Sequence, residues 1–211
     1  MKHFEVLDLG EIDYQKAFDL QKKYRELRIQ GKISDTLLFV SHPPVFTLGK
    51  RNSDEYILSS REQISEDRIQ FVQSDRGGLV TYHGPGQIII YFIVNIRALK
   101  WSIPKFVFLI EEIILKTLAH FHIEASRDED YPGVWCGDDK IAAIGLHFDR
   151  GVSNHGVALN VCPNLRHYRH IIPCGIRDRG VTSMEQQLGS NIFCDEVKII
   201  LLGQMERVLK I

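Results

Sequence analysis

The sequence predicts an α+β fold, in which helices pack on a mixed, largely antiparallel sheet within a single domain of residues 1–211. Runs with strand-like composition outnumber helical stretches, and most are joined by short turns instead of helices. No internal repeat, low-complexity segment or linker rich in Pro, Gly and Ser divides the chain. With 44% hydrophobic and 25% charged residues, the composition is that of an ordinary globular protein with a substantial core.

Four stretches predict helices. Three of them carry apolar side chains at helical spacing, and Gly31 is a suitable stop for the first. Pro104 suits the first turn of the second helix. The remaining helix is short, and Ser183 and Gln186 fit the capping box that would begin it. In chain order, the expected helices begin near Asp13, Ser102, Ser183 and Asp195, and Asp195 is the candidate N-cap of the last one.

The strand-like runs are short and rich in β-branched and aromatic residues. Residues 149–153 lie between two of these runs and have the composition of a hairpin turn. The predicted strands cover residues 36–40, 45–48, 69–72, 79–82, 87–96, 140–148 and 155–161.

Charge and cysteine usage narrow the class of protein. A net charge of -1 argues against a nucleic-acid partner, which normally requires a basic excess. The four cysteines form no CxxC pair, so we expect free thiols in a reducing compartment. Residues 1–5 lack the apolar stretch of a signal peptide, and the longest apolar run, 88–94, is too short to span a bilayer. We therefore expect a cytoplasmic protein without a membrane partner.

The glycine-rich segment 76–87 is the most distinctive part of the chain. Its paired glycines allow close approach of the backbone to a ligand, and a Gly-Pro-Gly turn reverses the chain. Arg76 and His83 are its candidate polar contributors to a site. The apolar run 88–94 follows directly and predicts a buried strand, which would hold the segment rigidly against the core.

Cys174 and Lys140 are candidate reactive residues. Cys174 stands between a proline and a glycine, outside any periodic run, where a thiol is exposed and positioned. Lys140 opens a buried strand, and desolvation there would lower its pKa. The alternatives are a structural cysteine and a lysine whose amine extends into water. The two residues, taken alone, leave both interpretations open.

Other kinds of site have little support. The chain lacks the His-x-x-Glu-His and Cys-x-x-Cys spacings of metal sites, the glycine patterns of phosphate loops and the G-x-S-x-G elbow. We therefore expect no metal and no cofactor. His83 and His155 each adjoin a glycine and are better candidates for lining a site. A basic cluster near Cys174 is either a solvated loop or a docking patch for an acidic partner; it comprises Arg166, His167, Arg169, His170, Arg177 and Arg179.

Together, these motifs resemble those of the lipoyl(octanoyl) transferases. The resemblance implies a fold shared with the biotin and lipoate protein ligases. It also implies a reaction that needs no cofactor: octanoate passes from acyl carrier protein to a cysteine and then to a lysine of a lipoyl domain. The motifs that carry the resemblance are residues 42–49, 76–87, 131–135, 140–145, 155–161 and 173–176.

Roles follow from the resemblance by motif position. Cys174 is the expected nucleophile, and Lys140 is the expected general acid/base. The expected acceptors are lipoyl domains of 2-oxoacid dehydrogenase complexes and the glycine cleavage H protein. The expected acyl-site residues are Arg76, Gly77, Gly78, Leu79, Val80, Thr81, Tyr82, His83, Ala143, Ile144, Gly145, Gly156, Val157 and Ala158. The small residues among them leave room for an alkyl chain between strands.

Three points stay open from the sequence. In a regular strand Lys140 points away from the face of Ala143 and Gly145, so it must precede the regular pleat unless those contacts are made by backbone. Backbone N–H groups near Gly77, Gly78 or Cys174 are candidates for oxyanion stabilisation. An ATP-dependent lipoate or biotin ligase and a non-catalytic acyl-binding module are the alternative functions.

Overall fold

The computed structural model of the protein describes residues 4–51 and 54–210. Residues 1–3, which form part of the segment examined for a signal peptide, lie outside the described residues. The strands are β1 (Phe4–Glu11), β2 (Asp35–Ser41), β3 (Val45–Leu48), β4 (Gln70–Gln73), β5 (Thr81–His83), β6 (Gln87–Ile93), β7 (Ser126–Arg127), β8 (Gly133–Cys136), β9 (Asp139–Asp149), β10 (Val152–Asn160) and β11 (Gly180–Val181). The helices are α1 (Tyr14–Ile29), α2 (Arg61–Glu66), α3 (Ile103–His120), α4 (Met184–Leu188) and α5 (Cys194–Leu209), with 3-10 turns η1 (Asp54–Tyr56), η2 (Leu165–His170) and η3 (Pro173–Gly175).

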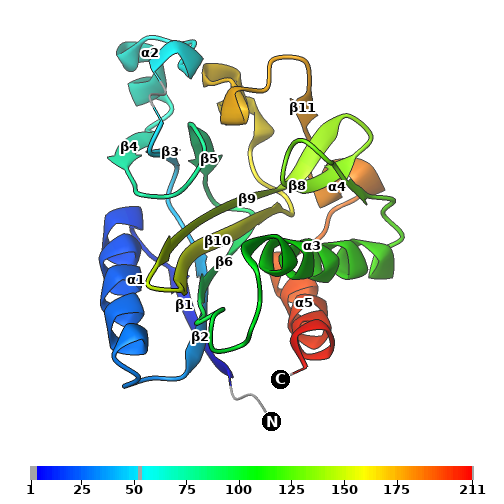
Figure 1. The fold of residues 1–211 in the computed structure, drawn as a ribbon. Coiled ribbons are helices and arrows are strands. Elements are labelled where there is room, and N and C mark those ends of the chain that lie inside the picture. The colour runs from blue at the N-terminus through cyan, green and yellow to red at the C-terminus, as the bar shows by residue number, and fades with distance from the viewer. Residues whose placement is uncertain (1–3, 52–53, 211) are drawn as a thin grey trace.

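The described strands form two sheets, as Figure 1 shows. The large sheet has the order β1-β2-β6-β10-β9-β8-β7, and β11 pairs with β9 beside this path. Its pairs are antiparallel except β1 with β2 and β11 with β9. The small sheet, β4-β3-β5, stands apart from it. The predicted α+β class with a mixed, largely antiparallel sheet is confirmed, although two sheets form where one was expected.

Helices cover both faces of the large sheet (Figure 1). Helix α1 packs on β6 and β10, while α3 and α5 pack on each other over the opposite face. The apolar run of β6 divides between these faces because successive side chains point to opposite sides. Ile88, Ile90 and Phe92 enter the core beneath α3 and α5, whereas Ile89 and Tyr91 enter the one beneath α1. A strand buried on both faces explains why its sequence is continuously apolar.

Most predicted helix starts are confirmed by their hydrogen bonds. The side chains of Asp13, Ser102 and Ser183 each accept a backbone N–H from the first turn that follows. The capping box at Ser183 is only half formed, because the side chain of Gln186 bonds the Thr182 hydroxyl instead. The predicted N-cap at Asp195 is wrong, since the N-cap is Phe193, two residues earlier, and α5 begins at Cys194. Asp195 instead lies in the first turn, where its negative charge favours the helix dipole.

The predicted strands are present with shifted ends. The hairpin turn is tighter than expected, because Val152 and Ser153 already belong to β10. The run 79–82 overlaps β5 only in part, and the run 87–96 ends at Ile93. Four strands and one helix were not predicted: β1, β7, β8, β11 and α2. Short strands and charged edge strands show little alternation of apolar and polar residues. Whether such a segment becomes a strand therefore depends on the strand with which it pairs.

A substitution at Gly156 tests the close packing of β10 against β6 at the centre of the large sheet. A Cβ at this position would lie 1.9 Å from the carbonyl oxygen of Ile90 on β6. We expect Gly156→Ala to lower the free energy of unfolding by at least about 2 kcal/mol in urea denaturation. Gly203→Ala is the control, because a Cβ at Gly203 meets nothing within 4 Å. Alanine favours the helical conformation over glycine, so this variant should be more stable than the wild type by about 0.8 kcal/mol. Equal stability of the two variants would contradict the close packing.

Candidate active site

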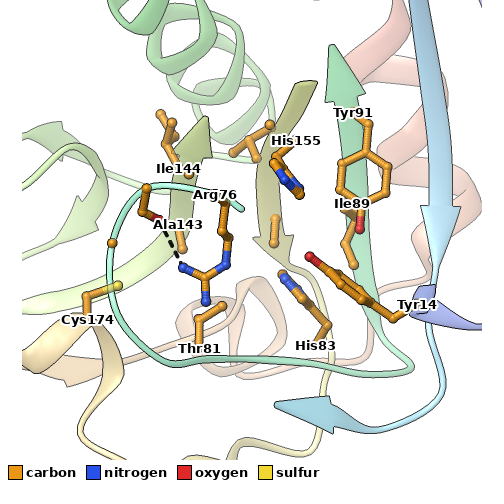
Figure 2. Close-up of a pocket in the computed structure, with 16 residues that line it drawn as sticks. Tyr14, Arg76, Thr81, His83, Ile89, Tyr91, Ala143, Ile144, His155 and Cys174 are labelled. Carbon is orange, nitrogen blue, oxygen red and sulfur yellow. Dashed lines mark hydrogen bonds between the residues drawn. The ribbon is translucent and has the colours of Figure 1, made fainter. Parts of the chain in front are cut away.

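One cavity collects side chains from α1, β5, β6, β9, β10, η3 and the glycine-rich segment (Figure 2). Its free space, including the part open to solvent at the mouth, is about 480 Å³. The residues that line it are Tyr14, Arg76, Gly77, Gly78, Thr81, His83, Ile89, Tyr91, Ala143, Ile144, Gly145, His155, Gly156, Val157, Ala158 and Cys174. The cavity therefore brings together the glycine-rich segment, the small residues of two central strands and the candidate nucleophile.

Three of the expected acyl-site residues lie elsewhere. Val80 and Tyr82 belong to the apolar cluster beside the small sheet. The Tyr82 hydroxyl bonds Nδ1 of His167 at 2.7 Å. Leu79 packs beside Gly175, next to Cys174. A Cβ added at Gly175 would lie only 2.6 Å from the Leu79 Cδ1. These residues shape the surroundings of the cavity, and the binding roles of the lining residues stay a prediction.

The sequence did not single out Tyr14, Ile89 or Tyr91 for the site, although His155 was recognised as a candidate. Tyr14 belongs to the apolar stripe of α1, and the other two belong to the buried run of β6. Apolar periodicity predicts burial without distinguishing a core from a cavity wall. The available signal was the tyrosine hydroxyl, because a buried hydroxyl needs a polar partner.

Cys174 is held in a strained turn. Its backbone adopts the left-handed conformation with φ 56°, and Gly175 follows with φ 75°. A residue with a Cβ adopts this conformation at a cost of about 1 kcal/mol. A hydrogen bond from the Cys174 N–H to the carbonyl of Val80, 3.0 Å long, stabilises the turn. The half-buried thiol is therefore fixed in the cavity wall, as a nucleophile requires.

Lys140 is buried near Cys174. Its Nζ donates to the carbonyl oxygen of Pro132 at 3.3 Å and lies 4.6 Å from the centre of the Trp135 ring. Burial lowers the pKa of Lys140, while the nearby Cys174 and Asp128 oppose that shift. Desolvation therefore increases the fraction of Lys140 in the neutral amine form relative to a free lysine. A proton acceptor needs this neutral form.

A bulge in β9 determines the side to which Lys140 points. The register between β8 and β9 shifts so that Val134 pairs with Ala142 but Trp135 pairs with Lys140, which leaves Ile141 unpaired. Ile141 and Ala142 both pack in the core beneath α3 and α5. The alternation is interrupted there, so Lys140 shares the face of Ala143 despite the odd spacing. Of the two expected arrangements, Lys140 preceding the regular pleat is the one found.

Arg76 is a buried cation that anchors the glycine-rich segment. Its Nε and one terminal nitrogen donate to the Thr47 hydroxyl at 3.1 and 2.9 Å, and the other donates to the carbonyl of Gly77 at 3.0 Å. Burial lowers the pKa of Arg76, although a guanidinium stays protonated in proteins. Within residues 4–51 and 54–210, none of the ion pairs found involves Arg76. Its charge is therefore left to act on groups inside the cavity.

The histidines near the cavity are held neutral by burial. His83 donates from Nδ1 to Gln87 Oε1 at 3.2 Å, and desolvation keeps its pKa well below the usual value. Burial lowers the pKa of His42 to about 4. The pKa of His155 is also lowered by burial, although Asp75 opposes the shift through a 2.6 Å contact with Nε2. The cavity therefore contains polar ring nitrogens without additional positive charge.

The three oxyanion candidates differ in their backbone hydrogen bonds. The N–H of Gly77 donates to the carbonyl of Leu146 at 3.0 Å, and the N–H of Cys174 donates to Val80. Among the described residues, the N–H of Gly78 has no such backbone acceptor, and Gly78 lines the cavity with φ 89°. Gly78 is therefore the candidate with a donor left for a ligand.

The basic cluster near Cys174 is partly neutralised. Arg169 and His170 both contact Asp67, and Arg179 pairs with Asp128. These contacts with Asp67 and Asp128 reduce the net positive charge of the cluster, which weakens the interpretation of a docking patch for an acidic partner. Within the described part of the chain, no group of three or more His, Cys, Asp and Glu side chains has the arrangement of a metal site. No helix there is long and apolar enough to cross a membrane.

The comparisons with known proteins agree with this geometry. The family model of the lipoyl protein ligase A/B catalytic domain matches residues 13–206. An octanoyltransferase of Alkaliphilus metalliredigens is 50% identical over 188 residues, which cover 89% of this chain and 86% of the relative. An octanoyltransferase of Caldicellulosiruptor bescii is 47% identical over 194 residues, covering 91% and 85%.

Solved structures share the fold at low sequence identity. Lipoate-protein ligase A bound with ATP has a TM-score of 0.79 at 16% identity, covering 99% of this chain and 86% of that one. Biotin protein ligase from Aquifex aeolicus has a TM-score of 0.54 at 14% identity, covering 100% and 70%. The family model and the octanoyltransferase relatives, together with this fold, define an enzyme of the class that acylates proteins. The chain belongs to the lipoyl protein ligase A/B catalytic domain family, and within it to the octanoyltransferases.

The anchoring role of Arg76 can be tested by Arg76→Lys. An ammonium cannot reproduce the several hydrogen bonds that the guanidinium makes to Thr47 and Gly77. We expect the free energy of unfolding to fall by about 1–3 kcal/mol in urea denaturation. The control is Arg207→Lys on the exposed face of α5, with an expected change within about 0.5 kcal/mol. A similar small change in both variants would contradict the anchor.

Proposed function

We propose that this octanoyltransferase uses Cys174 as its nucleophile and Lys140 as its general acid/base, with octanoyl-acyl carrier protein as the donor. The observation that carries the proposal is the position of Cys174, in a strained turn of the cavity wall and within electrostatic range of the buried Lys140. Small residues at Ala143 and Gly156 leave space for an alkyl chain to extend from the thiol into the cavity. Residues 1–211 would act as one catalytic domain.

In the first step, the acyl group moves from one sulfur to another. The neutral amine of Lys140 takes the proton of the Cys174 thiol, and the thiolate attacks the thioester carbonyl carbon. The bond between that carbon and the carrier sulfur breaks, and the carrier thiolate takes the proton back from Lys140. One thioester replaces another, so the step is near balance and needs no ATP.

In the second step, the acyl group moves from sulfur to nitrogen. The amine of the acceptor lysine attacks the carbonyl carbon of the Cys174 thioester, and Lys140 receives the proton that the amine loses. The carbon–sulfur bond breaks, an amide forms, and Cys174 leaves as a thiolate that recovers a proton from Lys140. Replacing a thioester by an amide is favourable, which draws the transfer to completion.

Negative charge develops on the carbonyl oxygen in both steps. The N–H of Gly78 is the proposed hydrogen-bond donor to this oxygen, because it lines the cavity with no backbone acceptor among the described residues. The guanidinium of Arg76 adds a fixed positive charge nearby. It lies close enough to Cys174 for the two side chains to interact electrostatically. Donors arranged before the reaction stabilise the transition state without reorganising.

The family implies lipoyl domains as acceptors. We propose that these are the lipoyl domains of 2-oxoacid dehydrogenase complexes and the H protein of glycine cleavage. Cytoplasmic conditions suit the chemistry, because the nucleophile must remain a thiol and the four cysteines are all free.

A covalent intermediate is the first expected outcome. Incubation with octanoyl-acyl carrier protein should add one octanoyl group to the protein, located on Cys174 by mass spectrometry of peptides. Cys174→Ser should lose this adduct and at least about a hundredfold in transfer to a lipoyl domain. Cys194→Ala is the control, because burial raises the pKa of that thiol to about 12 and makes it a poor nucleophile.

The same experiment distinguishes the alternative functions. An ATP-dependent ligase would transfer free octanoate in the presence of ATP and retain this activity in Cys174→Ser. A non-catalytic binding module would bind the octanoyl group reversibly and give no adduct. Either result would overturn the proposed mechanism.

The pH dependence tests Lys140. Because burial lowers its pKa, the neutral amine forms at a lower pH than in a free lysine, whose pKa is about 10.4. The rate of Cys174 acylation should therefore rise with pH through a transition below that value. In Lys140→Arg the side chain stays protonated, so the rate should fall about a hundredfold or more. Rapid-quench acylation measures both; an unchanged profile in the variant would remove Lys140 from the mechanism.

A further inference from the structure

Two buried polar atoms at one end of the cavity have no hydrogen-bond partner among the described residues. They are the hydroxyl of Tyr14 and Nδ1 of His155. Both side chains line the cavity, and each residue is only 2% exposed. Figure 2 shows the Tyr14 hydroxyl and the His155 ring facing the same part of the cavity. An unpaired buried polar atom is costly, so a pair of them in one cavity indicates a ligand that bonds both.

Contacts around His155 determine what its free nitrogen can do. Asp75 Oδ1 lies 2.6 Å from Nε2, so Nε2 carries the proton and donates to this carboxylate. The neutral ring therefore presents Nδ1 as a hydrogen-bond acceptor. Asp75 is itself held by Arg25 and Asn154, and the backbone N–H of His155 donates to Gln21 Oε1 at 2.8 Å. The acceptor is thus fixed in place.

Tyr14 presents the complementary donor. Its ring stacks on His83 with centres 6.0 Å apart and meets His42 edge-on at 5.2 Å. The Ser74 and Thr47 hydroxyls lie near enough to lower the pKa of Tyr14, against the larger opposing effect of burial, but neither makes a hydrogen bond of full geometry with its oxygen. The Tyr14 hydroxyl is therefore free to donate into the cavity.

Tyr91 adds a third polar atom at the same end. His42 donates from Nδ1 to the carbonyl of Ile12 at 2.6 Å, so its Nε2 accepts the proton of the Tyr91 hydroxyl at 2.7 Å. The lone pairs of the Tyr91 oxygen remain as acceptors. A water molecule needs two to four polar partners to be stable in a protein interior, and these three atoms supply them.

The polar end lies away from the nucleophile. Figure 2 shows Cys174 and Ala143 on one side of the cavity and Tyr14, Tyr91 and His155 on the other. Along β10, Ala158 pairs with Ala143 and His155 pairs with Leu146. At about 3.4 Å per residue, Ala158 and His155 are roughly 10 Å apart. An extended octanoyl chain is roughly 9 Å long, because each of its C–C bonds of about 1.5 Å advances a zigzag chain by only about 1.3 Å.

We propose that Tyr14 and His155 hold a water molecule that closes the acyl site and limits the chain to eight carbons. The inference rests on the proposed function, because it takes the acyl chain to extend from Cys174 into this cavity. A longer alkyl chain must displace the water and leaves the donor of Tyr14 and the acceptor of His155 without partners. A chain of that greater length with a terminal hydroxyl replaces the water and satisfies both atoms.

The test compares 8-hydroxyoctanoyl with nonanoyl, two chains of equal length that differ only in a terminal hydroxyl or methyl group. Each is presented to the enzyme on acyl carrier protein in competition, and the two Cys174 adducts are quantified by mass spectrometry. The wild-type enzyme should prefer the hydroxylated chain by at least about tenfold, since the methyl group leaves two polar atoms unsatisfied. Equal use of the two chains by the wild type would overturn the inference.

Tyr14→Phe tests the residue while keeping its stacking on His83. The preference for 8-hydroxyoctanoyl over nonanoyl should fall to within about threefold, because the donor is lost. The control is Tyr24→Phe on the same helix, outside the cavity lining, which should keep the wild-type preference. An unchanged preference in Tyr14→Phe would contradict the proposed wall. Failure of octanoyl to acylate wild-type Cys174 would instead contradict the proposed function, so the two failures are distinct.

Discussion

The buried guanidinium of Arg76 is the interaction on which the site depends. It bonds Thr47 in the small sheet, while the next residue, Gly77, donates its N–H to Leu146 in the large sheet. The methylene stem of Arg76 packs against Gly145, where a Cβ would lie 3.3 Å from Arg76 Cδ. One side chain thereby joins two sheets that share no strand, and the cavity is the space this junction encloses. The junction fixes the start of the glycine-rich segment, and the hydrogen bond from Cys174 to Val80 fixes its middle.

Burial also determines which groups in and around the cavity carry charge. Desolvation acts on Arg76, Lys140, His83 and His155 alike, yet their protonation differs because their intrinsic pKa values differ. The histidines become neutral, the guanidinium stays charged, and the lysine is brought closer to neutrality. The same physical cause therefore supplies a fixed cation, a lysine suited to the proposed proton transfer and polar but uncharged walls. This division suits acyl transfer, in which charge develops only on the carbonyl oxygen and one proton is exchanged.

Chemistry and fold are separate properties of this protein. Lipoate-protein ligase A and biotin protein ligase share the fold at 16% and 14% identity, which shows the architecture alone. The catalytic proposal rests on particular groups: a cysteine in a left-handed turn and a lysine placed by a bulge. The bulge could not be predicted, because an unpaired Ile141 arises from the register of β8 against β9. Residue alternation along β9 alone points Lys140 the wrong way.

The sequence by itself determined the α+β class, the main helices and strands, and the segments that meet at the cavity. The class and its elements depend on residues a few positions apart, through side-chain alternation, capping hydrogen bonds and the conformational freedom of glycine, whereas the segments of the site follow from the family resemblance. Tertiary structure alone decided that there are two sheets, that Leu79, Val80 and Tyr82 lie behind the cavity, and that Tyr14 and Tyr91 line it. Tyr14, Tyr91 and His155 lie far apart in the chain but line the same end of the cavity. No local sequence pattern predicts that they come together. Packing of α1 on β6 and β10 brings them together, and the cavity they enclose exists only in the folded chain.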